Sequence, residues 1–85
     1  MFTTKQEVIT NIEKNKALLK QIKYKKTQKF SKPLLDMLNK FHIILQNEDK
    51  NVQEIISKYN QWYKQLEINI QIDRIKVYEK MQEMK

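Results

Sequence analysis

The chain has 85 residues, of which 40% are hydrophobic and 32% are charged, and its formal net charge at pH 7 is +7. A chain of this length and composition forms one folded domain with a modest core. It has no cysteine, which excludes disulfides and thiolate sites, and it has no glycine and one proline, which excludes glycine-rich phosphate loops. We therefore expect a single domain over residues 1–85 that acts through the surface of packed helices.

The N-terminus lacks the apolar stretch of a signal peptide, and no apolar run approaches the roughly 20 residues of a membrane-spanning helix. These features predict a cytoplasmic protein. The charge is unevenly distributed, because residues 1–32 hold nine lysines and two glutamates, whereas residues 33–85 hold eight basic and eight acidic side chains.

The first predicted helix spans about residues 5–25. Thr4 and Glu7 have the spacing of a capping box, in which each side chain binds a backbone amide at the helix start. Apolar residues then recur on one side at helical spacing. These are Val8, Ile12, Leu19 and Ile22.

The second predicted helix spans about residues 32–46. Pro33 has no amide hydrogen and suits the first turn of a helix, so Ser31 is the expected N-cap. Its apolar stripe consists of Leu34, Leu35, Leu38, Phe41 and Leu45. A polar loop follows over residues 46–49, with Asp49 or a neighbour as the next cap.

The third predicted helix, about residues 50–70, has the clearest pattern. Its stripe consists of Val52, Ile55, Ile56, Tyr59, Trp62, Tyr63, Leu66 and Ile70. Trp62 and Tyr63 obey this period, so we interpret them as core residues.

Residues 66–72 alternate between apolar and polar side chains, a period typical of a strand, although no second strand exists for pairing. We interpret this stretch as a brief extended segment, after which Asp73 caps a fourth helix over about residues 74–84. The alternative is one 35-residue helix whose second face, with Ile68, Ile72 and Ile75, packs on another subunit. The preferred interpretation is an all-α antiparallel four-helix bundle, a monomer or weak dimer.

The sequence predicts no enzyme, no metal site and no cofactor. His42 is the only histidine, which excludes a histidine pair or a serine–histidine triad within one subunit, and we place it at the edge of the second apolar stripe. On the last helix, acidic residues, Glu79 among them, lie three or four positions from basic ones, as on a solvated face.

The strongest basic feature is a set of lysines interleaved with Tyr24 and Phe30. These are Lys20, Lys23, Lys25, Lys26, Lys29 and Lys32. They could meet nucleic-acid phosphates or an anionic membrane surface, or they could form a solvated face. Nucleic acid ranks lower, because base recognition favours arginine and this stretch has none.

The order of these features resembles the immunity proteins of pediocin-like (class IIa) bacteriocins. The similar features are a first helix beginning Lys5-Gln6-Glu7-Val8-Ile9, the Phe30-Ser31 entry into residues 34–38, the helix from Ile55 to Leu66 with aromatic residues midway, and the joint at residues 69–73. The chain departs from the family by ending almost directly after the fourth helix.

The resemblance implies a basic, cytosolic four-helix bundle, peripheral at the inner membrane face, that confers resistance to an antimicrobial peptide without catalysis. The implied partner is a bacteriocin-bound mannose-type phosphotransferase permease. The residues expected to contact it are Arg74, Lys76, Tyr78, Lys80 and Met81.

Two other functions stay open on the sequence. One is a small nucleic-acid-binding or phage-type regulatory protein that uses the lysines of residues 20–32. The other is a dimeric helical adaptor that uses Ile68, Ile72 and Ile75.

Overall fold

The computed structural model describes residues 1–47 and 51–84. These residues form four helices and no strand. The helices are α1 (Lys5–Lys20), α2 (Lys25–Asn47), α3 (Val52–Gln65) and α4 (Ile68–Glu83). Every helix packs against the other three, which confirms the predicted all-α four-helix bundle. The expected cap at Asp49 lies outside the described residues.

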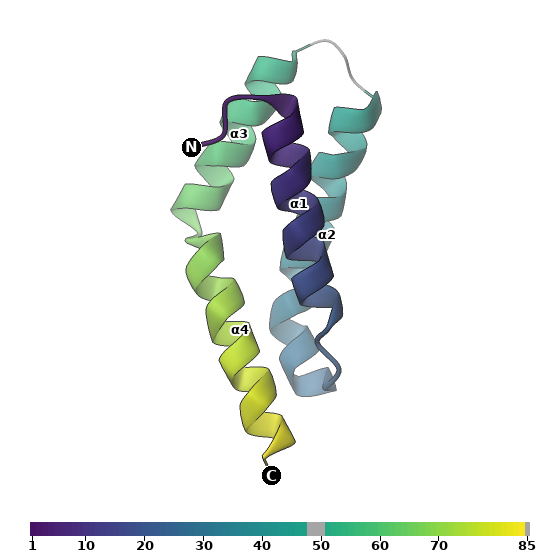
Figure 1. The fold of residues 1–85 in the computed structure, drawn as a ribbon, viewed down its shortest axis with the longest axis vertical. Coiled ribbons are helices and arrows are strands. Elements are labelled where there is room, and N and C mark those ends of the chain that lie inside the picture. Colours follow the sequence, from purple (N-terminus) through teal and green to yellow (C-terminus); the bar gives the residue numbers. More distant parts are fainter. Residues whose placement is uncertain (48–50, 85) are drawn as a thin grey trace.

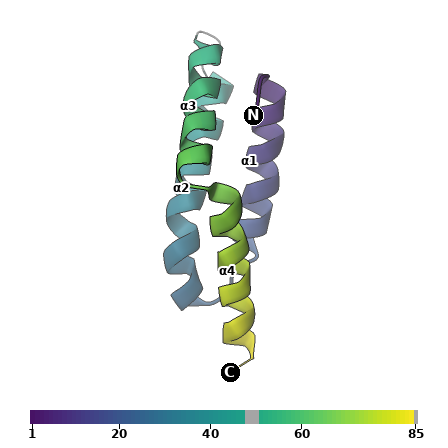
Figure 2. The same cartoon turned by 90° about the vertical axis from the view of Figure 1, so that its left-hand side faces the viewer.

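Figure 1 shows how the helices are arranged. α1 and α2 form an antiparallel hairpin, and α3 runs antiparallel to α2 along its second half. α4 then continues in the direction of α3 beyond a break, and the turned view in Figure 2 shows the same end-to-end order. The molecule is therefore elongated, at 49 × 21 × 17 Å, and the α1–α2 hairpin is covered by α3 at one end and by α4 at the other.

The core is a continuous apolar cluster, to which all four helices and Ile22 in the first loop contribute side chains. Tyr59 lies at its centre, fully buried, with the rings of Phe2, Phe41, Trp62 and Tyr63 at centroid distances of 5.1–5.8 Å. Trp62 and Tyr63 are half-buried against this cluster, which confirms them as core residues. Aromatic stacking of this kind adds to the stabilisation from burial.

The capping box at the start of α1 is confirmed. The Glu7 amide donates to Thr4 Oγ1 at 3.1 Å, and the Thr4 amide donates to Glu7 Oε1 at 3.0 Å. The predicted end near residue 25 is wrong, because α1 ends at Lys20. Tertiary hydrogen bonds replace helical ones there: the Gln28 side-chain amide donates to the carbonyl of Ile22, and Glu79 binds the amide of Lys23.

The predicted start of the second helix is also wrong, because α2 begins at Lys25 and contains Pro33 in its interior. Ser31 is not an N-cap: it is buried, and its hydroxyl donates to the carbonyl of Gln28 at 3.4 Å. Ser31 and Thr27 extend the buried stripe of Leu34 by one and two turns towards the start of α2, since small polar side chains fit at this helix contact. Because proline has no amide hydrogen, Pro33 cannot donate to the carbonyl of Lys29, as a residue inside a helix normally would. Both residues are exposed, so water can bind this carbonyl instead.

The predicted joint at residues 69–73 is wrong as well. α3 ends at Gln65, the chain turns at Leu66 and Glu67, and α4 begins at Ile68, so Asp73 lies inside a helix and caps nothing. The third helix is thus shorter than predicted, and the fourth is longer.

The alternation in residues 66–72 has a helical explanation. Ile68 and Ile72 lie one turn apart on the buried face of α4, whereas Leu66 and Ile70 are exposed. The surface proposed for a second subunit, Ile68, Ile72 and Ile75, is therefore buried within the chain and is not available to one.

Candidate partner-binding site

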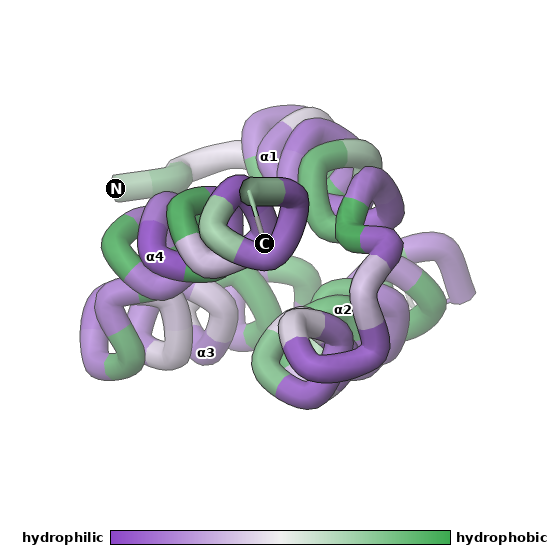
Figure 3. The backbone as a smooth tube through the Cα atoms, turned by 90° about the horizontal axis from the view of Figure 1, so that it is seen from below, coloured by the Kyte–Doolittle hydropathy of each residue, from purple (hydrophilic) through white to green (hydrophobic). Residues whose placement is uncertain are grey.

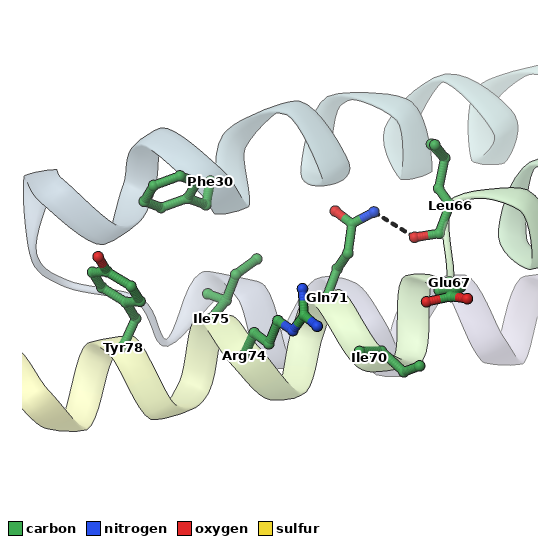
Figure 4. A pocket seen from close by; sticks show the side chains of 8 residues that line it. All are labelled: Phe30, Leu66, Glu67, Ile70, Gln71, Arg74, Ile75 and Tyr78. Carbon is green, nitrogen blue, oxygen red and sulfur yellow. Dashed lines mark hydrogen bonds between the residues drawn. The ribbon is translucent and has the colours of Figure 1, made fainter.

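The candidate site is a groove of about 430 Å³ between α2 and α4, at the joint with α3. Figure 4 shows the side chains around it, with Phe30 on α2 opposite Tyr78 and Ile75 on α4. We call it the α2–α4 groove. It is lined by Phe30, Leu66, Glu67, Ile70, Gln71, Arg74, Ile75 and Tyr78.

The groove exposes apolar side chains that a monomer would ordinarily bury. Phe30 is 53% exposed and Tyr78 48% exposed, and their ring centroids are 5.6 Å apart. Leu66 and Ile70 continue this apolar wall towards α3. Contiguous exposed apolar surface is typical of partner-binding sites, which makes this groove the candidate site.

The break between α3 and α4 creates the groove. Glu67 adopts the left-handed conformation (φ 49°), which ends the path of α3 and restarts the chain as α4. The Gln71 side-chain amide then donates to the carbonyl of Leu66, as the dashed line in Figure 4 shows. This hydrogen bond replaces a helical one and fixes the joint at which Leu66 points outward.

Arg74 is the only arginine of the chain, and it lines the groove. Among residues 1–47 and 51–84, no carboxylate lies within ion-pair distance of its guanidinium. An arginine beside exposed aromatic rings suits a partner that presents both apolar and anionic groups, because its planar fork binds carboxylate or phosphate at two points.

The five residues predicted to bind a partner do not form one site. Arg74 and Tyr78 line the α2–α4 groove, and Met81 is 54% exposed on the outer side of α4. Lys76 and Lys80 instead line a second depression, about 510 Å³, between α4 and the end of α1. The structure therefore brings together only two of the five in the groove.

The six lysines of the basic segment are all exposed. Lys20 ends α1, Lys23 lies in the loop, and the remaining four lie on the first two turns of α2. Lys25, Lys29 and Lys32 recur at four- and three-residue spacing, so they share one side of that helix. The segment lies at the same end of the molecule as α4, since Phe30 contacts Tyr78.

Glu79 does not lie on a solvated face as the sequence suggested. It is 8% exposed, and its Oε2 accepts a 2.6 Å hydrogen bond from the backbone amide of Lys23. The interpretation failed because the carboxylate pairs with a loop amide 56 residues away, which helical spacing cannot indicate. Its role is to hold the loop that joins α1 to the lysine-bearing start of α2.

His42 is half-buried on α2, as expected for the edge of the stripe. Its Nδ1 lies 3.5 Å from Lys16 Nζ, and its Nε2 lies 3.3 Å from the Gln46 amide. Within the described part of the chain, no three histidine, cysteine, aspartate or glutamate side chains are grouped so that they could hold a metal ion.

Several residues of the groove lie outside the partner-binding set that the sequence predicts. Phe30 falls between two predicted helices, and Leu66 and Ile70 belong to the predicted buried stripe of the third helix, yet all three side chains are exposed. The sequence did carry a signal for an exposed apolar surface on α4. This helix has apolar residues on two sides, and only one of the two sides is buried in the bundle. Gln71 gave no signal, because its partner is a carbonyl exposed only by the break.

No helix in the described residues has the length and apolarity needed to cross a bilayer. No family model matches the chain, and neither the characterised proteins nor the solved structures that were compared with it contain a match. The all-α bundle is thus the established property of the chain.

Proposed function

We propose that this chain is a non-catalytic immunity protein that protects a bacterium from a pediocin-like bacteriocin. In this proposal it recognises the bacteriocin-bound mannose-type phosphotransferase permease at the cytosolic membrane face. The order of sequence features that resembles this family motivates the proposal. The observation that carries it on the structure is the α2–α4 groove, where Arg74 lies beside the exposed rings of Phe30 and Tyr78 and has no ion-pair partner among residues 1–47 and 51–84.

A groove of this type supports binding rather than catalysis. Its polar side chains are Glu67, Gln71, Arg74 and the Tyr78 hydroxyl, and no histidine lines it. Aromatic residues and arginine are enriched where proteins bind partners tightly. Arg74 and Tyr78 are therefore the residues of the predicted set that we place at the centre of the contact.

Expression of the chain in a bacterium sensitive to pediocin-like peptides tests the proposal. We expect protection against at least one peptide of a panel, loss of protection with Arg74→Glu, and full protection with Lys40→Glu. The two variants make the same charge reversal, but Lys40 is exposed on α2 outside the groove. If every peptide of the panel kills the expressing bacterium as well as it kills the sensitive one, with the chain shown to be expressed and folded, the proposal is wrong.

A nucleic-acid-binding regulator is the second candidate, and the observation in its favour is the row formed by Lys25, Lys29 and Lys32. Lysines in a row can neutralise successive phosphates, which makes the affinity depend steeply on salt. Binding to duplex and single-stranded DNA and RNA at two salt concentrations tests this candidate. Absence of binding at low salt would remove it.

A further inference from the structure

We propose that the outer face of α4, together with the neighbouring lysines, is a docking surface for an anionic lipid bilayer. The α4 outer face consists of Ile70, Val77, Met81 and Met84, which are between 46% and 85% exposed. This inference deepens the proposed function, since it names the surface by which the chain would reach the membrane.

The first observation is that α4 is apolar on two opposite sides. Ile68, Ile72 and Ile75 are buried against the bundle, whereas Ile70, Val77 and Met81 are about half exposed. The exposed residues recur at spacings of seven, four and three positions up to Met84, so they form one stripe along the helix. In Figure 3, apolar segments likewise occur on both sides of α4. The bundle needs only one of these stripes.

The second observation is the charge at the same end of the molecule. Residues 20–32 contain six lysines and no acidic residue, and all six lysines are exposed. Two contacts hold this segment against α4: the Lys23 amide binds Glu79, and the ring of Phe30 packs on Tyr78. Arg74 adds a further positive charge beside the stripe. An apolar stripe with basic flanks is the pattern of helices that lie in the membrane interface.

The chemistry of the flanks favours lipid over a protein or nucleic-acid partner. Lysine is depleted at protein–protein interfaces, whereas each lysine near an anionic lipid surface strengthens binding to it. Nucleic-acid interfaces are more polar than this surface, which offers four large apolar side chains. Tyr78, with Tyr24 exposed in the adjacent loop, also suits the headgroup region, where aromatic rings with one polar end accumulate.

Vesicle binding by the full chain tests the proposal. We expect co-sedimentation with vesicles of mixed phosphatidylcholine and phosphatidylglycerol, weaker binding at higher salt, and little binding to phosphatidylcholine alone. Val77→Glu should weaken binding by about tenfold or more, because it removes an inserted apolar side chain and introduces a negative charge.

The matched control is Ile43→Glu. Ile43 is 56% exposed on α2 and Val77 is 59% exposed, so the two variants change net charge equally at equally exposed apolar positions. We expect Ile43→Glu to bind nearly as well as the unaltered chain. Equal weakening by the two variants would mean that only net charge matters, which would overturn the α4 outer face as the docking surface.

A second measurement reports contact directly. The chain has no cysteine, so a single Val77→Cys or Ile43→Cys substitution introduces one thiol. An environment-sensitive fluorophore attached to that thiol then reports on one position only. The emission should shift to the blue with anionic vesicles at position 77 and stay unchanged at position 43. No shift at position 77, or no vesicle binding at low salt, would overturn the proposal and favour a protein or nucleic-acid partner for this surface.

These outcomes are separable from those of the immunity assay. A chain that binds vesicles but gives no protection would contradict the proposed function alone. A chain that protects cells but ignores vesicles would contradict the lipid surface alone.

Discussion

The carboxylate of Glu79 on α4 holds the backbone amide of Lys23 at 2.6 Å and so joins the last helix to the loop between the first two. Its other oxygen, Oε1, is buried and has no hydrogen-bond partner among the described residues. The loop between α1 and the lysine-bearing start of α2 therefore depends on a side chain 56 residues away.

Replacing Glu79 with alanine removes this attachment. Hydrogen bonds to charged groups contribute about 1.5–3 kcal/mol, and loss of the unpartnered Oε1 offsets part of that, so we expect the free energy of unfolding to fall by about 1–2 kcal/mol. Urea unfolding measures this change, and amide hydrogen exchange at Lys23 should become faster. The control is Glu83→Ala, an exposed carboxylate one turn further on, for which a change within about 0.5 kcal/mol is expected. Equal effects of the two substitutions would contradict the role of Glu79.

Tyr59→Phe tests the polar contact at the centre of the core. Tyr59 is fully buried, and its hydroxyl donates to Asn11 Oδ1 at 2.5 Å. Removal of the hydroxyl leaves the ring packing intact but takes away one partner of Asn11, so we expect a loss of about 1 kcal/mol in thermal or urea unfolding. Tyr63→Phe should cost less, because the Tyr63 hydroxyl binds Asn69 in an exposed position.

The same residue makes a prediction about alkaline titration. Burial raises the pKa of the Tyr59 hydroxyl well above its ordinary value. Tyr59 should therefore stay protonated while the chain is folded, and its ultraviolet ionisation signal should appear only as the fold is lost at high pH. A signal from Tyr59 in the ordinary tyrosine range, with the helical circular dichroism unchanged, would contradict this burial.

The capping box makes the free energy of unfolding depend on pH in the acid range. Hydrogen bonds from Thr3 and Thr4 lower the pKa of Glu7 from 4.5 to about 2. Because the folded pKa is lower than the unfolded one, the charged carboxylate stabilises the fold fully above pH 4.5, and this contribution disappears as pH falls towards 2. We expect Glu7→Gln to be less stable than the unaltered chain at neutral pH and the difference to vanish near pH 2. A constant difference across this pH range would refute the assignment.

Within residues 1–47 and 51–84, two residues adopt backbone conformations that favour glycine. Asn51 has φ 64° and Glu67 has φ 49°, both in the left-handed region. Asparagine tolerates this region and glutamate does not, so Glu67→Gly should raise the free energy of unfolding by up to about 1 kcal/mol. Asn51→Gly is the matched control, with a smaller gain expected in the same urea titration. A loss of stability with Glu67→Gly would show that the glutamate side chain stabilises the joint.

The sequence predicted those features that depend on neighbours along the chain. The capping box of Thr4 and Glu7 is local, and the stripe around Ile56 and Tyr59 extends over several turns without interruption. The capping box was confirmed, and so was the stripe as far as Tyr63, whereas its last two predicted members, Leu66 and Ile70, are exposed. The existence of four helices followed from these periodic segments, since each needs a partner for its apolar side.

The features that the sequence did not predict depend on contacts between distant segments. Ser31 and Pro33 look like a helix start, yet the helix continues through them because Thr27 and Ser31 are small enough to be buried. The position of the α3–α4 joint depends on the conformation of Glu67 and on the bond from Gln71, neither of which has a sequence signature. The groove exists only because of this joint, so the membership of Leu66 and Gln71 could not be predicted, whereas Arg74 and Tyr78 belong to the predicted partner-binding set.

The two faces of α4 place different limits on how this protein can change during evolution. Ile68, Ile72, Ile75 and Glu79 are held by the bundle, so substitutions there would be selected against through loss of the fold. Substitutions at Ile70, Val77 or Met81 would leave the fold intact and change only the exposed surface that α4 offers for binding. Natural variants that differ in their target should therefore diverge at these outer positions while the inner four stay nearly constant.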